Sequence, residues 1–485
     1  MTIPGIDKAR EKFAKFVPKS KTVRSISVLA GGTAMAQFIN ILFAPLLTRV
    51  YSPADFGVLS VYTAILALLL AFSGFGYHLA IPLPKANNRA FNLLVLSMIL
   101  HLLLCLFVAT AIFFVPDKWV RILKWESLQP YFWLIPLGFA GGGFYTILNY
   151  WAVREKAFGV ISRTRMAQSI FGGITQIFLG FIGLRPIGLL IGQFINRTAG
   201  ILSLASSFKG RTFRFPRSHR LKHVAKRYRR FPLYSSWGTL LNTASAQITP
   251  ILLVSWYSES VAGWFSLGNR LINLPLLIIG ASVSQVYFQK ASASRFSGNT
   301  ANVTEKFFKA LAIVGIFPLI AIAIIAPNLF STVFGKDWAI SGLYVRFLAP
   351  YLIFQVLASP LSTVFFAMER QRTLLVFQSI LLLTRVTSLY SGRFFESADH
   401  SILFYGVASA AAYCVYLLLI LNISGNKLTT LMRFIGKISV HSVLLLLPCL
   451  YFQIMGKQIF MYSSAFLGSC AFLLVWRSYL KALFN

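Results

Sequence analysis

KGRTFRFPRSHRLKHVAKRYRR, at residues 209–230, carries ten lysines and arginines and no acidic residue. Long apolar segments precede and follow it. Loops rich in Lys and Arg stay on the cytoplasmic side of a membrane, so this stretch fixes the orientation of the segments on either side. A basic run can also bind nucleic acid. The apolar flanks favour a cytoplasmic loop, and we expect no nucleic-acid partner.

The composition is that of a membrane protein. Of the 485 residues, 57% are hydrophobic and 12% are charged, whereas about a quarter of the residues of a soluble domain are charged. Apolar runs of about 18 or more residues recur from end to end, which is typical of transmembrane helices. The alternating strands of an outer-membrane barrel are absent. We predict an all-α polytopic membrane protein.

We predict about fourteen transmembrane helices, which puts both termini on one side. With this threading, loops predicted to be cytoplasmic hold roughly 32 of the 46 Lys and Arg residues, and outward loops hold about 8. This bias predicts cytoplasmic termini. The predicted spans are 25–50, 54–82, 90–115, 129–151, 158–183, 186–208, 233–257, 261–289, 304–327, 339–367, 372–391, 400–422, 432–454 and 458–477.

The two halves of the chain share short motifs, offset by about 206–210 residues. Both halves start from the predicted cytoplasm, so the repeat is parallel, and such proteins usually bind their substrate between the two bundles. The matches are Ala36-Gln37 with Ala246-Gln247, and Tyr51-Ser52 followed by Gly57 with Tyr257-Ser258 followed by Gly263.

This organisation predicts five parts. They are a cytoplasmic basic N-terminus (1–24), a first six-helix bundle (25–208), a cytoplasmic basic linker (209–232), a second six-helix bundle (233–422), and two additional helices with a cytoplasmic C-terminus (423–485).

The sequence lacks the usual signatures of catalysis. It has no phosphate-binding loop, no nucleophile elbow, no paired catalytic carboxylates and no metal-ligand spacing. Its four cysteines fall inside apolar runs without a CxxC motif. We therefore expect no cofactor, no metal and no enzymatic activity, and we interpret the chain as one that binds and moves a ligand.

Arginines inside apolar spans are the informative residues. Arg270 lies roughly 13 Å along its span at 1.5 Å per residue, and Arg197 and Arg385 are similarly deep. A charge at that depth costs about 2.5–3.5 kcal/mol on insertion scales. Acids are almost absent from the spans, because Asp55 and Glu369 sit at span ends. The missing partner is therefore predicted to be an anionic substrate, against the alternative that these arginines pack on carbonyls or snorkel.

Polar residues follow the same helix faces and predict the wall of a hydrophilic cavity, although lone polar residues are often interhelical contacts. Arg49 lies beside Asp55 across a tight turn, which leaves a local pair and a substrate role equally open. The predicted substrate-binding residues are Arg270, Arg197, Arg385, Arg49, Asn40 and Asn273. The polar faces comprise Thr33, Gln37, Asn40 and Thr48; Asn242, Ser245 and Thr249; and Ser266, Asn269, Arg270 and Asn273.

Three stretches carry a family resemblance: LLTRVYSPADFGVLSVYTAI (46–65), RRFPLYSSWGTLLNTASAQITPILL (229–253) and AGWFSLGNRLINLPLLIIGASVSQVYFQKAS (262–292). They resemble polysaccharide flippases, the Wzx-like branch of the multidrug/oligosaccharidyl-lipid/polysaccharide exporter superfamily. The family often has Arg-Tyr-Glu near the end of the second span, where this chain has Gly76, Tyr77 and His78. This departure leaves no charged pair at that place.

The resemblance implies two six-helix bundles around a central cavity, with Arg270 as the cavity arginine of the eighth span. It implies translocation of undecaprenyl-diphosphate-linked oligosaccharide across the bacterial inner membrane, for O-antigen, capsule or exopolysaccharide. The implied partners are this substrate, membrane lipids, and a polysaccharide polymerase with a chain-length regulator.

Three other functions fit less well. A multidrug cation antiporter of the same fold needs buried acids, which are nearly absent from the spans. A polysaccharide polymerase or ligase would be expected to carry a large outward loop, and the largest predicted here is roughly 116–128. A scaffold that recruits glycosyltransferases through 209–230 would leave the buried arginines unexplained.

Overall fold

A computed structural model of the chain describes residues 21–206, 216–294, 299–368 and 370–484. Within these ranges every regular element is a helix, which confirms the predicted all-α class. Most of the predicted N-terminal part (1–20) and the first residues of the predicted linker (209–215) lie outside the described residues. The division into two bundles and an appendage stays a prediction.

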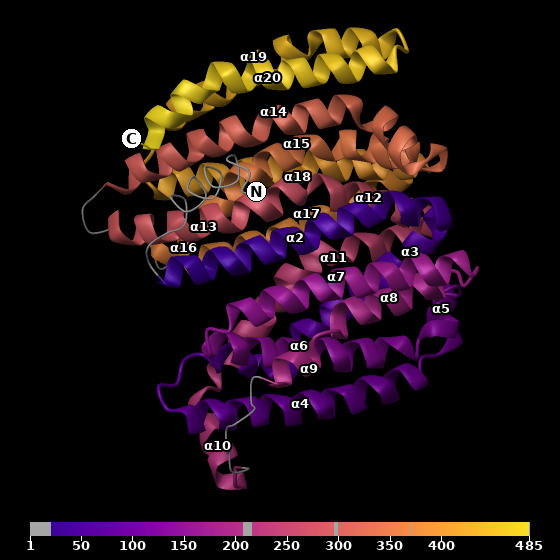
Figure 1. Ribbon diagram of the computed structural model, residues 1–485, viewed down its shortest axis with the longest axis vertical. Coiled ribbons are helices and arrows are strands. Elements are labelled where there is room, and N and C mark those ends of the chain that lie inside the picture. Colours follow the sequence, from indigo (N-terminus) through magenta and orange to yellow (C-terminus); the bar gives the residue numbers. More distant parts are fainter. Residues whose placement is uncertain (1–20, 207–215, 295–298, 369, 485) are drawn as a thin grey trace, which may run out of the picture.

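The long helices run side by side and are stacked along the longest axis of the molecule (Figure 1). They are α2 (Lys21–Val50), α3 (Pro53–Ala71), α4 (Asn87–Phe113), α6 (Leu134–Arg154), α7 (Phe158–Phe181), α8 (Ile187–Thr198), α11 (Ser236–Trp256), α12 (Glu259–Ile272), α13 (Leu274–Ser294), α14 (Thr300–Phe334), α15 (Ala339–Leu361), α17 (Gln371–Ser391), α18 (Ala398–Ile423), α19 (Leu428–Ile454) and α20 (Gln458–Phe484). Short helices connect them: α5 (Asp117–Leu123), α9 (Ile201–Ala205), α10 (Ser218–Arg227) and α16 (Val364–Ala367).

Ten helical stretches of the described residues are long and apolar enough to cross a membrane, judged by length and composition. The chain is therefore a multi-pass membrane protein. The predicted count of fourteen spans stays a prediction, because α6, α7, α11 and the α12–α13 segment fall outside these ten. All four carry residues that line the polar cavity described below, and polar side chains lower the mean hydropathy of a helix.

The second predicted span, 54–82, is not one continuous helix. The α-helix α3 ends at Ala71, and a 3₁₀ segment, η1 (Ser73–Ala80), follows. Gly74, Phe75 and Gly76 all have positive φ there, a conformation that two glycines make accessible. The chain therefore turns before it reaches the end of the predicted span.

Two further predicted spans are also broken. Within 186–208, Gly200 adopts a φ of 99° and separates α8 from α9. Within 261–289, α12 ends at Ile272. Pro275 lacks the N–H that would continue the helical hydrogen bonding to Leu271, which favours a break at this point.

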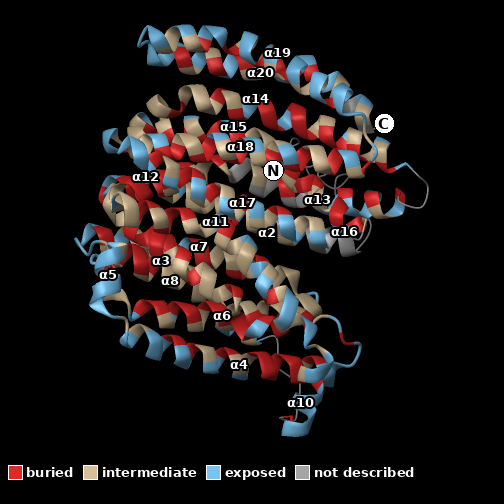
Figure 2. Ribbon diagram, turned by 180° about the vertical axis from the view of Figure 1, so that it is seen from behind, coloured by how far each residue is buried: buried red, intermediate tan, exposed pale blue. Residues whose placement is uncertain are grey.

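Helices from before and after the basic linker meet in the middle of the stack. Helix α3 contacts α11 and α12, and α2 contacts α7, α13 and α14. Helices α19 and α20 pack on α14 at one end, and α4 lies at the other end against α6 (Figure 1). Exposed residues run along both end layers (Figure 2). On α4 they include large apolar side chains, as expected where a helix faces lipid tails: Leu102, Leu103, Leu106 and Phe107.

A close crossing joins α3 to α12 at the end of the molecule that carries α5. A Cβ added to Gly57 would lie 2.0 Å from the carbonyl oxygen of Glu259, and one added to Gly263 would lie 1.9 Å from that of Pro53. Only glycine therefore allows the two backbones to approach this closely. These are the two glycines of the motif that the halves share, and each meets the start of the opposite helix.

Candidate functional site

A cavity of about 640 Å³ lies where the helices before and after the linker meet. Seven helices contribute to its wall: α2, α3, α6, α7, α8, α11 and α12. Most of the lining side chains are polar, and among the described residues that line it there is no Asp or Glu. The wall is therefore positively charged and rich in hydrogen-bonding groups.

Three arginines from three helices supply the charge of this cavity. Arg270, on α12, is exposed although it lies near the middle of the helix stack, because it borders the cavity. Arg197, on α8, is half-buried. Within the described ranges neither forms a hydrogen bond or an ion pair with the protein. Arg165, on α7, donates from Nη1 to Thr33 Oγ1 at 2.7 Å.

Three glutamines of the wall, one each from α2, α8 and α11, have side chains without a hydrogen-bonding partner in the described part of the protein. They are Gln37, Gln193 and Gln247, and all three line the cavity. Gln37 and Gln247 occupy matching positions in the Ala-Gln motifs of the two halves. Free amides in a wet cavity can donate to and accept from a ligand.

Other polar side chains of the wall are held by neighbouring helices. Asn40 Nδ2 donates to Ser169 Oγ at 3.2 Å, which links α2 to α7. Asn196 Nδ2 donates to the Gln168 carbonyl at 3.3 Å, which links α8 to α7. These contacts fix the shape of the wall and leave the free glutamines and the arginines to bind a ligand.

The cavity brings together three of the six residues predicted to bind substrate, namely Asn40, Arg197 and Arg270. Asn273 lies next to this group but does not line the cavity, and its Nδ2 donates to Asn269 at the backbone carbonyl (2.7 Å) and at Oδ1 (2.9 Å). It therefore supports the turn of helix that presents Arg270.

Arg49 lies away from the cavity, at the end that carries α5. Its Nη2 donates to the Thr332 carbonyl at 3.2 Å, which links α2 to α14. The Asp55 carboxylate accepts from the backbone N–H and the hydroxyl of Ser52, both at 2.8 Å, and caps α3. Arg49 and Asp55 therefore do not form the local pair considered from sequence: Arg49 contacts α14, and Asp55 contacts Ser52.

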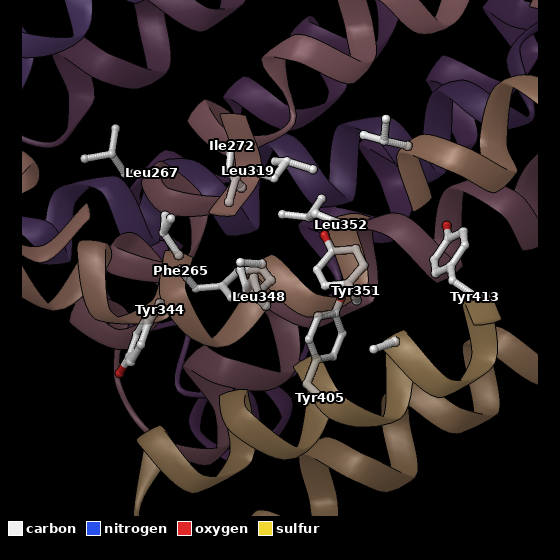
Figure 3. Close-up of a cluster of buried hydrophobic side chains, with 14 of the residues drawn as sticks. Phe265, Leu267, Ile272, Leu319, Tyr344, Leu348, Tyr351, Leu352, Tyr405 and Tyr413 are labelled. Atoms are coloured by element: carbon white, nitrogen blue, oxygen red, sulfur yellow. The ribbon is translucent and has the colours of Figure 1, made fainter. Parts of the chain in front are cut away.

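Arg385 lies behind the cavity wall and is only 6% exposed. Its Nη1 donates to the backbone carbonyl of Ser245, on α11. Its guanidinium carbon lies 5.4 Å from the ring centre of Tyr405 and 6.0 Å from that of Tyr351. Tyr351 and Tyr405 lie next to each other in the buried cluster of Figure 3. The Tyr351 hydroxyl donates in turn to Asn269 Oδ1 at 3.0 Å, so Arg385 contacts residues adjoining two parts of the cavity wall.

Sequence reasoning missed Arg165, which lies near the start of the predicted span 158–183 and was counted among the cations of the cytoplasmic loop before it. In the structure α7 begins at Phe158, so Arg165 lies two turns inside a helix. The signal that could have identified it is the helical spacing of Arg165, Gln168, Ser169 and Gln176, all of which line the cavity.

The chain resembles known proteins in its sequence and in its fold. The model of the family described as "Polysaccharide biosynthesis protein" matches residues 46–341. An "Uncharacterized membrane protein in cps region" from Klebsiella pneumoniae is 22% identical over 441 residues, which cover 89% of each chain.

Two of the similar solved structures are transporters. The lipid II flippase MurJ in its inward closed conformation has a TM-score of 0.75 at 15% identity, over 94% of this chain and 99% of that chain. An inward-facing multidrug resistance MATE family transporter of the MOP superfamily has a TM-score of 0.61 at 16% identity, over 82% of this chain and 96% of that chain. Both likenesses are likenesses of fold.

Proposed function

Because this chain belongs to the polysaccharide biosynthesis protein family, we propose that it is a flippase for lipid-linked oligosaccharide in the bacterial inner membrane. Its cargo is undecaprenyl-diphosphate-linked oligosaccharide, moved from the cytoplasmic to the periplasmic leaflet. The delivered units are used to assemble O-antigen, capsule or exopolysaccharide, and a polymerase and a chain-length regulator act on them.

One observation carries this proposal: Arg165, Arg197 and Arg270 converge on one cavity whose described lining has no acidic residue. Cations that line a cavity deep in the helix stack and have no protein counter-ion favour an anionic ligand, and a diphosphate supplies the negative charge. Charge-assisted hydrogen bonds from guanidinium to phosphate oxygens are among the stronger ones, and guanidinium can hold two oxygens at once. The cavity volume of about 640 Å³ falls in the usual range of ligand sites.

The sugars need a different kind of contact, and the free amides supply it. Gln37, Gln193 and Gln247 can each donate to and accept from sugar hydroxyls. Gln37 belongs to a helix before the linker and Gln247 to one after it, so a bound sugar can touch both halves. The polyprenyl tail stays in lipid, and rocking of the halves about the bound head group gives alternating access.

The multidrug antiporter alternative has the same fold but a different cavity chemistry. Cationic drugs and coupling cations are bound by carboxylates, and the described cavity wall offers none. Expression of this chain is therefore expected to leave resistance to cationic dyes unchanged. A transport-dependent rise in dye resistance would move the assignment to the antiporters.

The test compares arginines inside the cavity with an arginine outside it. Arg165→Ala and Arg270→Ala are expected to abolish or strongly reduce surface polysaccharide in a flippase-null strain, at normal membrane levels by immunoblot. Arg270→Lys should keep part of the activity, because it retains the charge but not the two-pronged geometry. The matched control is Arg163→Ala, because Arg163 is exposed on α7 and lies outside the cavity wall. Full complementation by both cavity variants would contradict the site.

A further inference from the structure

Helix α10 is a short basic helix that is docked through an apolar stripe. Val224 is buried, and Leu221 and Tyr228 pack against the same cluster at the start of α4. These three residues recur at a spacing of three to four and so share one face of the helix. The Tyr77 hydroxyl, from η1, donates to the Ala225 carbonyl at 3.2 Å. The helix is thus attached to the bundle by packing and by a hydrogen bond.

The position of α10 is unlike that of the long helices. It lies beyond α4, at the edge of the stack, and runs across the direction of the long helices in both views (Figures 1 and 2). Since the long helices follow the membrane normal, α10 lies roughly in the membrane plane. It packs on the first turns of α4, which begins at Asn87, and so sits at the level of the predicted cytoplasmic head groups.

The face of α10 that points away from the bundle is strongly cationic. Lys222 and Lys226 are one turn apart on one flank of the apolar stripe, and Arg220 and Arg227 are two turns apart on the other. All four are exposed. Residues 216–230 contain no Asp or Glu. The remaining exposed cations of this surface are Arg217, Arg229 and Arg230 beside α10, and Lys85 and Arg89 at the start of α4.

We propose that α10 and the start of α4 form a binding surface for anionic phospholipid head groups of the cytoplasmic leaflet. A cluster of lysines and arginines at the cytoplasmic surface of a membrane attracts anionic lipid head groups. The neighbouring surface supports this occupant. From Ile99 onward the exposed side chains of α4 are mostly apolar and face lipid tails, so this edge of the molecule borders lipid, and the head groups of the cytoplasmic leaflet there lie level with the α10 cations.

This surface is separate from the cavity and does not depend on what the cavity transports. The lipids it holds would attach the basic linker to the cytoplasmic leaflet next to the first helices. Removal of the positive charge would weaken that attachment and leave the cavity arginines in place.

The experiment measures lipid binding by the purified full-length protein with native mass spectrometry. Phosphatidylglycerol and phosphatidylcholine with the same acyl chains are titrated separately. The wild type is expected to bind phosphatidylglycerol more tightly, and added NaCl should weaken this preference by screening. The variant R220Q/K222Q/K226Q/R227Q should bind phosphatidylglycerol at least about tenfold more weakly, since each cation near an anionic surface contributes about fivefold to affinity.

The matched control keeps the charge at the same four positions: R220K/K222R/K226R/R227K should bind phosphatidylglycerol as the wild type does. The pairs R220Q/R227Q and K222Q/K226Q, each on one flank, should give intermediate losses and provide a test with smaller changes to the helix. Equal affinity of the wild type for both lipids would overturn the proposal. So would unchanged phosphatidylglycerol binding by the neutral variants, or displacement of the lipid by millimolar inorganic phosphate, which would indicate a site for free anions.

Discussion

Replacement of Gly57 by alanine tests the crossing of α3 and α12 at the α5 end. The new methyl group would lie 2.0 Å from the Glu259 carbonyl oxygen, whereas ordinary contact begins at 3.4 Å. The helices must therefore separate there by about 1.4 Å, the difference between these two distances. The obstacle is backbone, so no side-chain rotation can relieve it. Overpacking of this kind costs about 1–3 kcal/mol.

A glycine-to-alanine substitution at a position with free space around it should not destabilise the protein. A Cβ on Gly238, in α11, has no atom within 4 Å, so Gly238→Ala is the matched control. Alanine is favoured over glycine inside a helix by about 1 kcal/mol, so this control should be neutral or slightly stabilising. Gly57→Ala should be destabilising despite that gain, and Gly57→Ala combined with Gly263→Ala should be more so.

The consequence for transport follows from where the crossing lies. It holds together helices from before and after the linker at the α5 end, so the cost falls on arrangements in which that end is closed. A cost of about 1–3 kcal/mol shifts a two-state equilibrium by about 5- to 150-fold towards the open arrangement. A single cysteine at Ser266, in the cavity wall of a variant without native cysteines, reports this shift.

In Gly57→Ala this cysteine should react faster with a membrane-impermeant thiol reagent added from the periplasmic side, and the midpoint of thermal unfolding should fall. The Gly238→Ala control should change neither in that direction. A Gly57→Ala protein with wild-type unfolding and wild-type labelling would refute the idea that the glycine contact holds this end closed.

Three further predictions concern other parts of the chain. Arg385→Gln should lower the thermal unfolding midpoint of the purified protein, because the loss of a buried charged donor costs about 1–3 kcal/mol; unchanged unfolding would place Arg385 outside the supporting network. Gly143→Ala puts a methyl 2.0 Å from the His101 ring and should lower membrane levels on an immunoblot, and His101→Ala in the same chain should restore them; no restoration would contradict the clash. Reporter fusions at Ser218 and at the C-terminus should be active only as cytoplasmic reporters, and an outward signal at Ser218 would refute the predicted topology.

The existence of the helices could be predicted from sequence because apolar length alone specifies a membrane helix. Their breaks could not be predicted as easily. A straight helix and a broken helix can have the same hydropathy. The turn at residues 74–76 depends on positive φ angles, which hydropathy does not measure. Polar residues have the opposite effect on the prediction of a span. Helices α6, α7, α11 and the α12–α13 segment are less apolar than the ten candidate spans, and all four carry polar residues that line the cavity.

Part of the cavity could be predicted because its polar residues follow a helical spacing. Thr33, Gln37 and Asn40 on α2, with Asn269 and Arg270 on α12, were selected on that ground and all line the cavity. Arg165 was missed for a physical reason. A cation near the cytoplasmic end of a span satisfies the positive-inside rule, so its charge gave no reason to ask what it faces.

The contrast between Arg270 and Arg385 shows that the depth of an arginine within a span does not by itself identify a ligand-binding residue. Both are cations deep in apolar spans without an acidic partner, and the insertion cost that singles them out is the same for both. What separates them is the set of groups around each one. Arg385 finds a carbonyl and two tyrosine rings from other helices, whereas Arg270 finds no protein partner in the described structure and borders the cavity. Those partners come from three other helices, α11, α15 and α18, so only the fold distinguishes an arginine that the protein itself satisfies from one that awaits an anion.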